Sequence, residues 1–176
     1  KGKTADAKRL LLKYQQLELK DYHPETCLDA AKAYFETGDI FGCYFYVEQL
    51  KKQLEKADFL TDSQRLLLRT EQIRFEALYN AIKKMIDEAT DAYQNQLYGR
   101  AVLLFAQCFN EMPSNPAVAF SLLQAIARCE GVAEDTLYTA KRALELLQHA
   151  DLGMKSTEKL KLCLGLLQKK YPAVLG

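Results

Sequence analysis

The chain has 176 residues, of which 49% are hydrophobic and 27% charged, and its formal net charge is +1. This balance is typical of a folded globular domain and argues against a disordered chain. No basic face or run predicts binding to nucleic acid, and no window reaches the roughly 18 to 20 apolar residues of a membrane span. The sequence also starts without the apolar core of a signal peptide. We therefore expect one cytoplasmic domain over residues 1–176, with no membrane or nucleic-acid partner.

The first third of the chain has the pattern of three helices. An amphipathic helix is predicted over residues 4–20, and Pro24 suits the first position of the next helix, where its missing N–H costs nothing. Residues 40–47 are apolar throughout and could form a strand. Gly38-Asp39 before them and the helical spacing after them favour a buried helix instead.

A long helical period follows the pattern Thr61-x-x-Gln64, which is typical of a capping box at a helix start. The apolar stripe of this period crosses Asn80 without losing phase. The sequence leaves open whether residues 62–96 form one helix or two helices joined near Asn80.

The remaining elements are separated by turn signals. The chain turns over at residues 95–99, resumes as a helix and stops at Pro113. Asn115 is expected to cap the following helix, with Pro116 in its first turn. Two more helices are predicted over residues 134–149 and 156–170.

The spacing Ala101-x3-Phe105, with Pro113 after it, resembles the second helix of a tetratricopeptide repeat. Residues 24–57 match the same pattern around Gly38-Asp39, and the 34 residues from Ala89 to Leu123 equal one repeat length. Expected repeat hairpins cover about residues 24–57, 82–115 and 116–149, with flanking helices at 4–20, 62–80 and 156–170. The resemblance implies an all-α fold, in which helix-turn-helix repeats stack as a right-handed superhelix that a C-terminal helix caps.

The family resemblance also implies a concave groove that binds a peptide or partner protein. Its expected lining comes from the first helix of each repeat. Carried over to this sequence, the partner-binding positions are Leu28, Lys32, Phe35, Lys83, Ile86, Thr90, Tyr93, Phe120, Gln124 and Arg128.

A second, shorter resemblance is to the repeat domain of some bacterial two-component response regulators. It depends on Gly99-Arg100-Ala101-Val102 and on the link formed by residues 113–116. It implies the output half of a signalling protein.

The sequence leaves two alternatives to partner binding open. The chain could be a structural homodimerisation domain that pairs through Leu160, Leu164 and Leu167. It could also be an unrecognised enzyme, but no catalytic motif occurs, so the expectation is a non-catalytic protein without a cofactor. His23 and His149 lack partners at metal-ligand spacing, and the five scattered cysteines are expected to be reduced thiols, mostly in the core.

Overall fold

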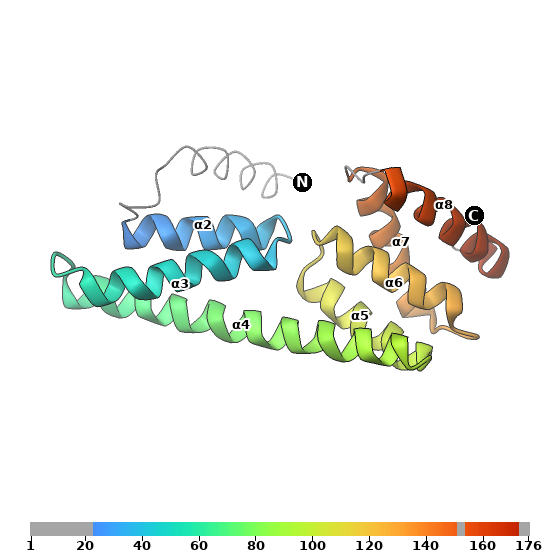
Figure 1. Cartoon of the computed structure of the whole chain (residues 1–176), viewed down its shortest axis with the longest axis horizontal. Helices are drawn as coiled ribbons and strands as arrows, with labels where there is room; N and C mark the ends of the chain where they lie inside the picture. Colours follow the sequence, from blue (N-terminus) through green and yellow to red (C-terminus); the bar gives the residue numbers. More distant parts are fainter. Residues whose placement is uncertain (1–22, 151–153, 173–176) are drawn as a thin grey trace. The chain divides into compact units, whose positions relative to one another are not determined.

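The computed structural model describes residues 23–150 and 154–172, and all regular structure in these ranges is α-helical (Figure 1). The helix predicted over residues 4–20 lies outside the described residues. The remaining helices follow the expected order along the chain. They are α2 (Pro24–Glu36), α3 (Ile40–Lys56), α4 (Asp62–Gln94), α5 (Tyr98–Glu111), α6 (Pro116–Arg128), α7 (Glu134–Gln148) and α8 (Met154–Lys170).

The chain divides into two compact units. Unit 1 covers Lys1–Ala81 and unit 2 covers Ile82–Gly176, so that the boundary falls inside α4. Helix α4 is continuous over 33 residues and passes Asn80 without a break. The sequence left open whether this stretch forms one helix or two, and the structure shows one helix. The expectation of a single helical-repeat domain stays a prediction.

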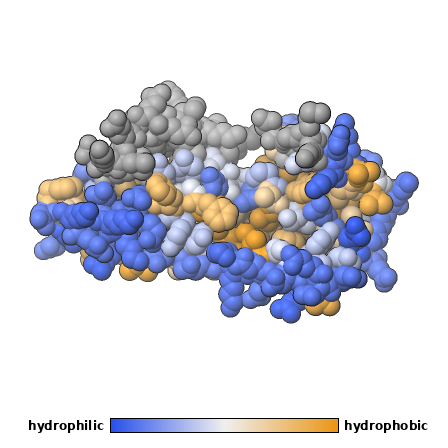
Figure 2. All heavy atoms as spheres, in the orientation of Figure 1, coloured by the Kyte–Doolittle hydropathy of each residue, from blue (hydrophilic) through white to orange (hydrophobic). Residues whose placement is uncertain are grey.

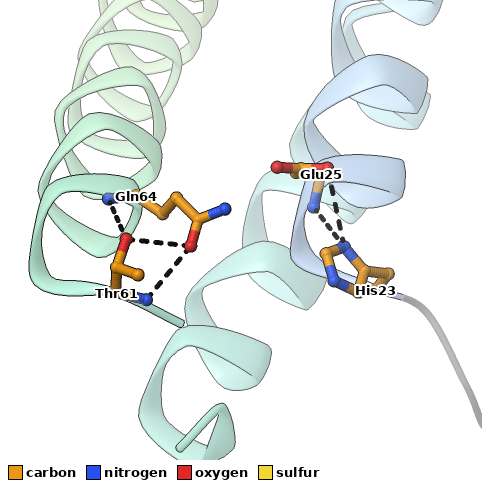
Figure 3. A network of polar contacts seen from close by, with 4 residues as sticks. All are labelled: His23, Glu25, Thr61 and Gln64. Atoms are coloured by element: carbon orange, nitrogen blue, oxygen red, sulfur yellow. Dashed lines mark hydrogen bonds and ion pairs between the residues drawn. The ribbon is translucent and has the colours of Figure 1, made fainter. Parts of the chain in front are cut away.

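Unit 1 is built from α2, α3 and the first part of α4. His23 caps α2 through Nδ1, which accepts a hydrogen bond from the N–H of Glu25 at 3.4 Å (Figure 3). Helices α2 and α3 pack side by side, as Figure 1 shows, and enclose an apolar core. The core residues of unit 1 include Cys27, Leu28, Ala30, Ala31, Cys43, Tyr46, Val47, Leu50, Leu54, Leu68 and Phe75.

The start of α4 has the predicted capping box. The hydroxyl of Thr61 accepts from the N–H of Gln64 at 3.3 Å, and Oε1 of Gln64 accepts from the N–H of Thr61 at 3.1 Å (Figure 3). Each side chain thus satisfies a backbone donor that the first turn of a helix leaves without a partner.

Unit 2 packs the end of α4 with four further helices. Helix α6 contacts α5, α7 and α8, and α5 also contacts α7. Asn115 caps α6 as predicted, because its side chain accepts from the N–H of Val118 at 2.9 Å. The core of unit 2 is larger than that of unit 1. It includes Ala89, Ala101, Phe105, Cys108, Phe109, Val118, Leu122, Leu123, Ile126, Leu137, Ala140, Ala143, Leu147, Leu160, Cys163 and Leu167.

The structure therefore confirms an all-helical chain whose helices pack against their neighbours. Two boundaries differ slightly from the predicted ones: Gly99 lies inside α5 rather than in the preceding turn, and α8 begins at Met154 rather than at residue 156. The right-handed superhelix of tetratricopeptide proteins stays a prediction.

Candidate partner-binding surface

Three of the predicted partner-binding residues, Leu28, Lys32 and Phe35, lie on α2 in unit 1. Two of them contact side chains of α4. Leu28 is buried in the core of unit 1 and is therefore not at the surface. Nζ of Lys32 lies 3.7 Å from a carboxylate oxygen of Glu71 on α4. The ring of Phe35 meets that of Phe75 on α4 edge to face, with ring centroids 5.9 Å apart. The side chains of Lys32 and Phe35 thus already contact α4, and Leu28 is not accessible to a partner.

The other seven predicted residues all lie in unit 2, and four of them are on α4. Ile86 and Tyr93 are half-buried and pack against the core of unit 2. Thr90, between them in the sequence, and Lys83, one turn before Ile86, are exposed. Nζ of Lys83 lies 2.5 Å from a carboxylate oxygen of Asp87, and the hydroxyl of Thr90 donates to the carbonyl of Ile86 at 2.7 Å. This stretch of α4 therefore offers two partly accessible apolar side chains with polar groups around them.

The last three predicted residues lie on α6. Phe120 is half-buried and packs against the same core as Ile86 and Tyr93. Gln124 follows one turn later and is also half-buried, and Arg128 is exposed in the last turn of the helix. A cation at this position interacts favourably with the helix dipole. We call the seven residues Lys83, Ile86, Thr90, Tyr93, Phe120, Gln124 and Arg128 the unit-2 face.

The cysteines of this chain are free, and four of them are buried core residues, as the sequence predicted. Burial raises the pKa of Cys27 to about 12 and that of Cys163 to about 11. Burial raises the pKa of Cys43 to about 12 as well, with a smaller contribution from the Asp39 carboxylate. A thiol with such a pKa carries almost no thiolate near neutral pH and is a weak nucleophile.

Potential metal ligands do not gather in the described part of the chain, where no group of three His, Cys, Asp or Glu side chains could hold an ion. Among these residues there is also no helix with the length and apolar character needed to cross a membrane.

One hollow of about 250 Å³ lies where α4 turns into α5, and the sequence did not indicate it. Its lining is mostly polar, and Nη2 of Arg100 lies 3.9 Å from a carboxylate oxygen of Glu88 at its edge. Glu88 and Arg100 therefore pair with each other at this hollow, while the Asp91 carboxylate in its lining has no ion pair among the described residues.

Helix α8 carries a surface feature that the sequence interpretation placed on the wrong residues. Leu160 and Leu167, predicted to pair with a second copy, are buried in the core of unit 2, and Leu164 is half-buried. The exposed leucines of α8 are Leu162 and Leu166. In Figure 2, hydrophobic and hydrophilic spheres lie next to each other where Figure 1 draws α8. The signal for this second apolar face is the i, i+4 spacing of the two leucines.

Comparisons with known proteins find no family model that matches the chain, and no curated protein or solved structure that matches it significantly. The resemblances to tetratricopeptide proteins and to response-regulator output domains therefore remain predictions.

Proposed function

We propose that this chain is a non-catalytic protein-interaction module that binds a peptide or partner protein through the unit-2 face. The observation that carries the proposal is the half-buried state of Ile86, Tyr93 and Phe120. Each side chain is anchored against the core of unit 2, yet each keeps part of its surface accessible. Side chains held in this way lose little conformational freedom on binding, and tyrosine in particular is enriched among binding hot spots.

Polar groups next to these apolar side chains would orient a partner. The amide of Gln124 can both donate and accept a hydrogen bond, and the guanidinium of Arg128 can bind a carboxylate through two parallel donors. Arg128 has no ion pair with any described residue, whereas Lys83 already contacts Asp87. Arg128 is therefore the cation of the unit-2 face with the most to gain from an acidic group on the partner.

A role in binding, rather than catalysis, also accounts for the side chains that often perform chemistry. His23 caps α2, and the four buried thiols serve as small core residues. Free thiols suit a reducing compartment, which supports the proposed cytoplasmic location.

The proposal can be tested by capture of partners from a lysate of the source cells. The test variant carries Phe120→Ala and Arg128→Glu. The matched control carries Leu103→Ala and Lys141→Glu, which remove an exposed apolar group and a cation from α5 and α7, outside the unit-2 face. Because Phe120 is half-buried, a thermal melt of each variant must first show that it is folded.

A partner that the wild type and the control retain, and that the test variant loses, supports the proposal. A partner retained equally by all three proteins rejects the unit-2 face as the binding surface. The single variant Arg128→Glu separates a lost contact from a disturbed core, since Arg128 is exposed and is expected to leave the fold unchanged.

A further inference from the structure

Helix α8 is apolar on two opposite sides. Its inner side places Leu160, Cys163 and Leu167 in the core of unit 2, where α8 packs against α6. Its outer side places Leu162 and Leu166 in solvent, with exposed fractions of 74% and 55%. A helix that packs against its neighbours by one side normally presents polar side chains on the opposite side. Two exposed leucines one turn apart are thus unexpected unless another element covers them.

The helix surface next to the two leucines carries no side chain at Gly165. Gly165 lies beside them on the outer side of α8, and a Cβ atom built at this position would meet no other atom within 4 Å. Glycine at such a position lets a second helix approach closely, since no side chain holds the two backbones apart.

Lysines flank the two leucines along the helix. Lys159 lies three residues before Leu162, and Lys169 lies three residues after Leu166. Both are exposed, and neither has an ion pair or hydrogen bond with the residues that the structure describes. Glu158 is the one carboxylate in the sequence of α8. Its outer side is therefore apolar at the centre and basic towards both ends.

Helix stability alone does not account for this charge. Lys169 and Lys170 lie in the last turn, where cations interact favourably with the helix dipole, and Lys170 donates a hydrogen bond to the carbonyl of Cys129. Lys159 and Lys161 lie far from that turn and are exposed without a carboxylate partner among the described residues.

We propose that the outer face of α8, formed by Leu162 and Leu166 with Lys159 and Lys169, binds an acidic amphipathic helix of another protein. The apolar side chains of that helix would cover the two leucines, while its carboxylates pair with the lysines. A second copy of the chain fits poorly, because pairing α8 with itself brings lysines of like charge together. A lipid surface is disfavoured as well, since two leucines offer little apolar area for insertion. This surface is separate from the unit-2 face, so either proposal can fail alone.

The test uses the whole chain of 176 residues and two synthetic peptides of about 18 residues, long enough to form an isolated helix. One peptide has leucines at helical spacing with glutamates on both flanks, and the other has lysines in place of the glutamates. Fluorescence anisotropy at low salt is expected to show at least about tenfold tighter binding of the acidic peptide, a difference near 1.4 kcal/mol. Raising the salt concentration is expected to weaken this binding, because exposed charges are screened.

Variants of α8 identify the surface that binds the acidic peptide. The double variant Leu162→Ala, Leu166→Ala is expected to lose most of the affinity, while Leu103→Ala, which removes a leucine of 61% exposure from α5, leaves it unchanged. The double variant Lys159→Glu, Lys169→Glu is expected to prefer the basic peptide. Arg128→Glu on the unit-2 face is expected to leave binding of the acidic peptide unchanged.

Several results would overturn the proposal. Equal affinity for the two peptides, or no binding of the acidic one, would remove the acidic helix as the occupant. Binding to phosphatidylserine vesicles that the leucine variant loses, without peptide binding, would assign the face to a membrane surface. Self-association in sedimentation that the same variant abolishes would assign it to a second copy.

Discussion

Gly38 and Gln96 occupy the same position in the turns that end α2 and α4. Both have a positive φ, of 80° and 61°. In each turn the N–H of this residue donates to the carbonyl three residues earlier, Phe35 or Tyr93, at 2.9 and 3.1 Å. The next N–H donates to the carbonyl five residues earlier, at 2.9 and 2.8 Å. Both helices thus end in a Schellman motif, in which glycine is the residue best suited to the left-handed position.

The side chain of Gln96 makes the second of these turns less favourable than the first. A residue with a Cβ atom pays about 1 to 2 kcal/mol for the left-handed conformation, and glycine pays no such penalty. We expect Gln96→Gly to raise the free energy of unfolding by roughly 1 kcal/mol, as measured by urea denaturation. Gly38→Ala is expected to lower it by a similar amount, because it introduces the same strain at the equivalent position.

Gln107→Gly provides the control for the loss of a side chain. Gln107 is exposed within α5, where glycine is about 1 kcal/mol less favourable than a good helix former. The control is therefore expected to destabilise the protein. If Gln96→Gly destabilises it too, the strain assigned to position 96 is contradicted.

Local signals in the sequence predicted most helix boundaries, because a boundary depends on a few neighbouring residues. Pro24 favours a helix start through its fixed backbone conformation, and the Thr61–Gln64 pair and Asn115 each cap a helix through hydrogen bonds to residues three positions away. The continuity of α4 was harder to predict. Asn80 is tolerated in an exposed helical position, and no proline or glycine near it forces a break.

The surfaces could not be predicted in the same way, since they depend on helices that are distant in sequence. Leu28 matches a groove position, yet it is buried in a core that α3 and α4 complete. In α8, one row of leucines and cysteine alternates with a second row that contains Leu162 and Leu166. Periodicity shows that both rows exist, but only the packing against α6 determines which row faces the core.

Gly42 in α3 is expected to tolerate no larger residue. A Cβ atom at this position would lie 2.3 Å from Cδ1 of Tyr34, whose ring stacks on Tyr46 with centroids 5.4 Å apart. The ring cannot yield without disturbing that stack, so Gly42→Ala is expected to lower the free energy of unfolding by about 1 to 3 kcal/mol despite the gain in helix propensity. Gly99→Ala is the matched control, because a Cβ atom there meets nothing within 4 Å. A thermal melt in which the two variants shift Tm equally would contradict this assignment.

The guanidinium of Arg65 ties the start of α4 to the end of α3. Nη1 donates to the carbonyl of Leu54 at 2.7 Å, and Nη2 donates to the carbonyl of Ala57 at 2.6 Å. Both acceptors lie where the last carbonyls of α3 have no partner within the helix. Arg65→Ala is expected to cost about 1.5 to 3 kcal/mol, the range for hydrogen bonds from a charged group.

Two variants show whether this loss of stability comes from the two N–H donors of the Arg65 guanidinium. Arg65→Lys is expected to recover only part of the stability, because an ammonium cannot reach two carbonyls with the same planar geometry. Arg69→Ala, which removes an exposed arginine without a hydrogen bond among the described residues, is expected to change stability little. Full recovery by lysine in urea denaturation would rule out the two-carbonyl role.

Alkaline pH is expected to destabilise the fold through its buried thiols. Burial, with a smaller contribution from the Asp39 carboxylate, raises the pKa of Cys43 from 9.0 to about 12. Above pH 9 the unfolded chain releases this proton while the folded chain retains it, so the unfolded state gains stability as pH rises. The contribution of a neutral Cys43 is thus fully present below pH 9 and is lost progressively between pH 9 and about 12. The expected loss is about 1.4 kcal/mol per pH unit for each such thiol.

The Cys43→Ala variant isolates the contribution of the Cys43 thiol to the pH dependence of stability, because the tyrosines and lysines are the same in the variant and the wild type. At pH 8 the variant is expected to be less stable than the wild type, because a small cavity replaces the buried sulfur. Its free energy of unfolding should then fall less steeply with pH, by about 1.4 kcal/mol per unit, so the difference between the two proteins narrows. Urea denaturation at pH 8, 9, 10 and 11, roughly spanning the window between the two pKa values, measures both slopes. Parallel slopes would show that the Cys43 thiol ionises equally in the folded and unfolded chains, contrary to its burial between α2 and α3.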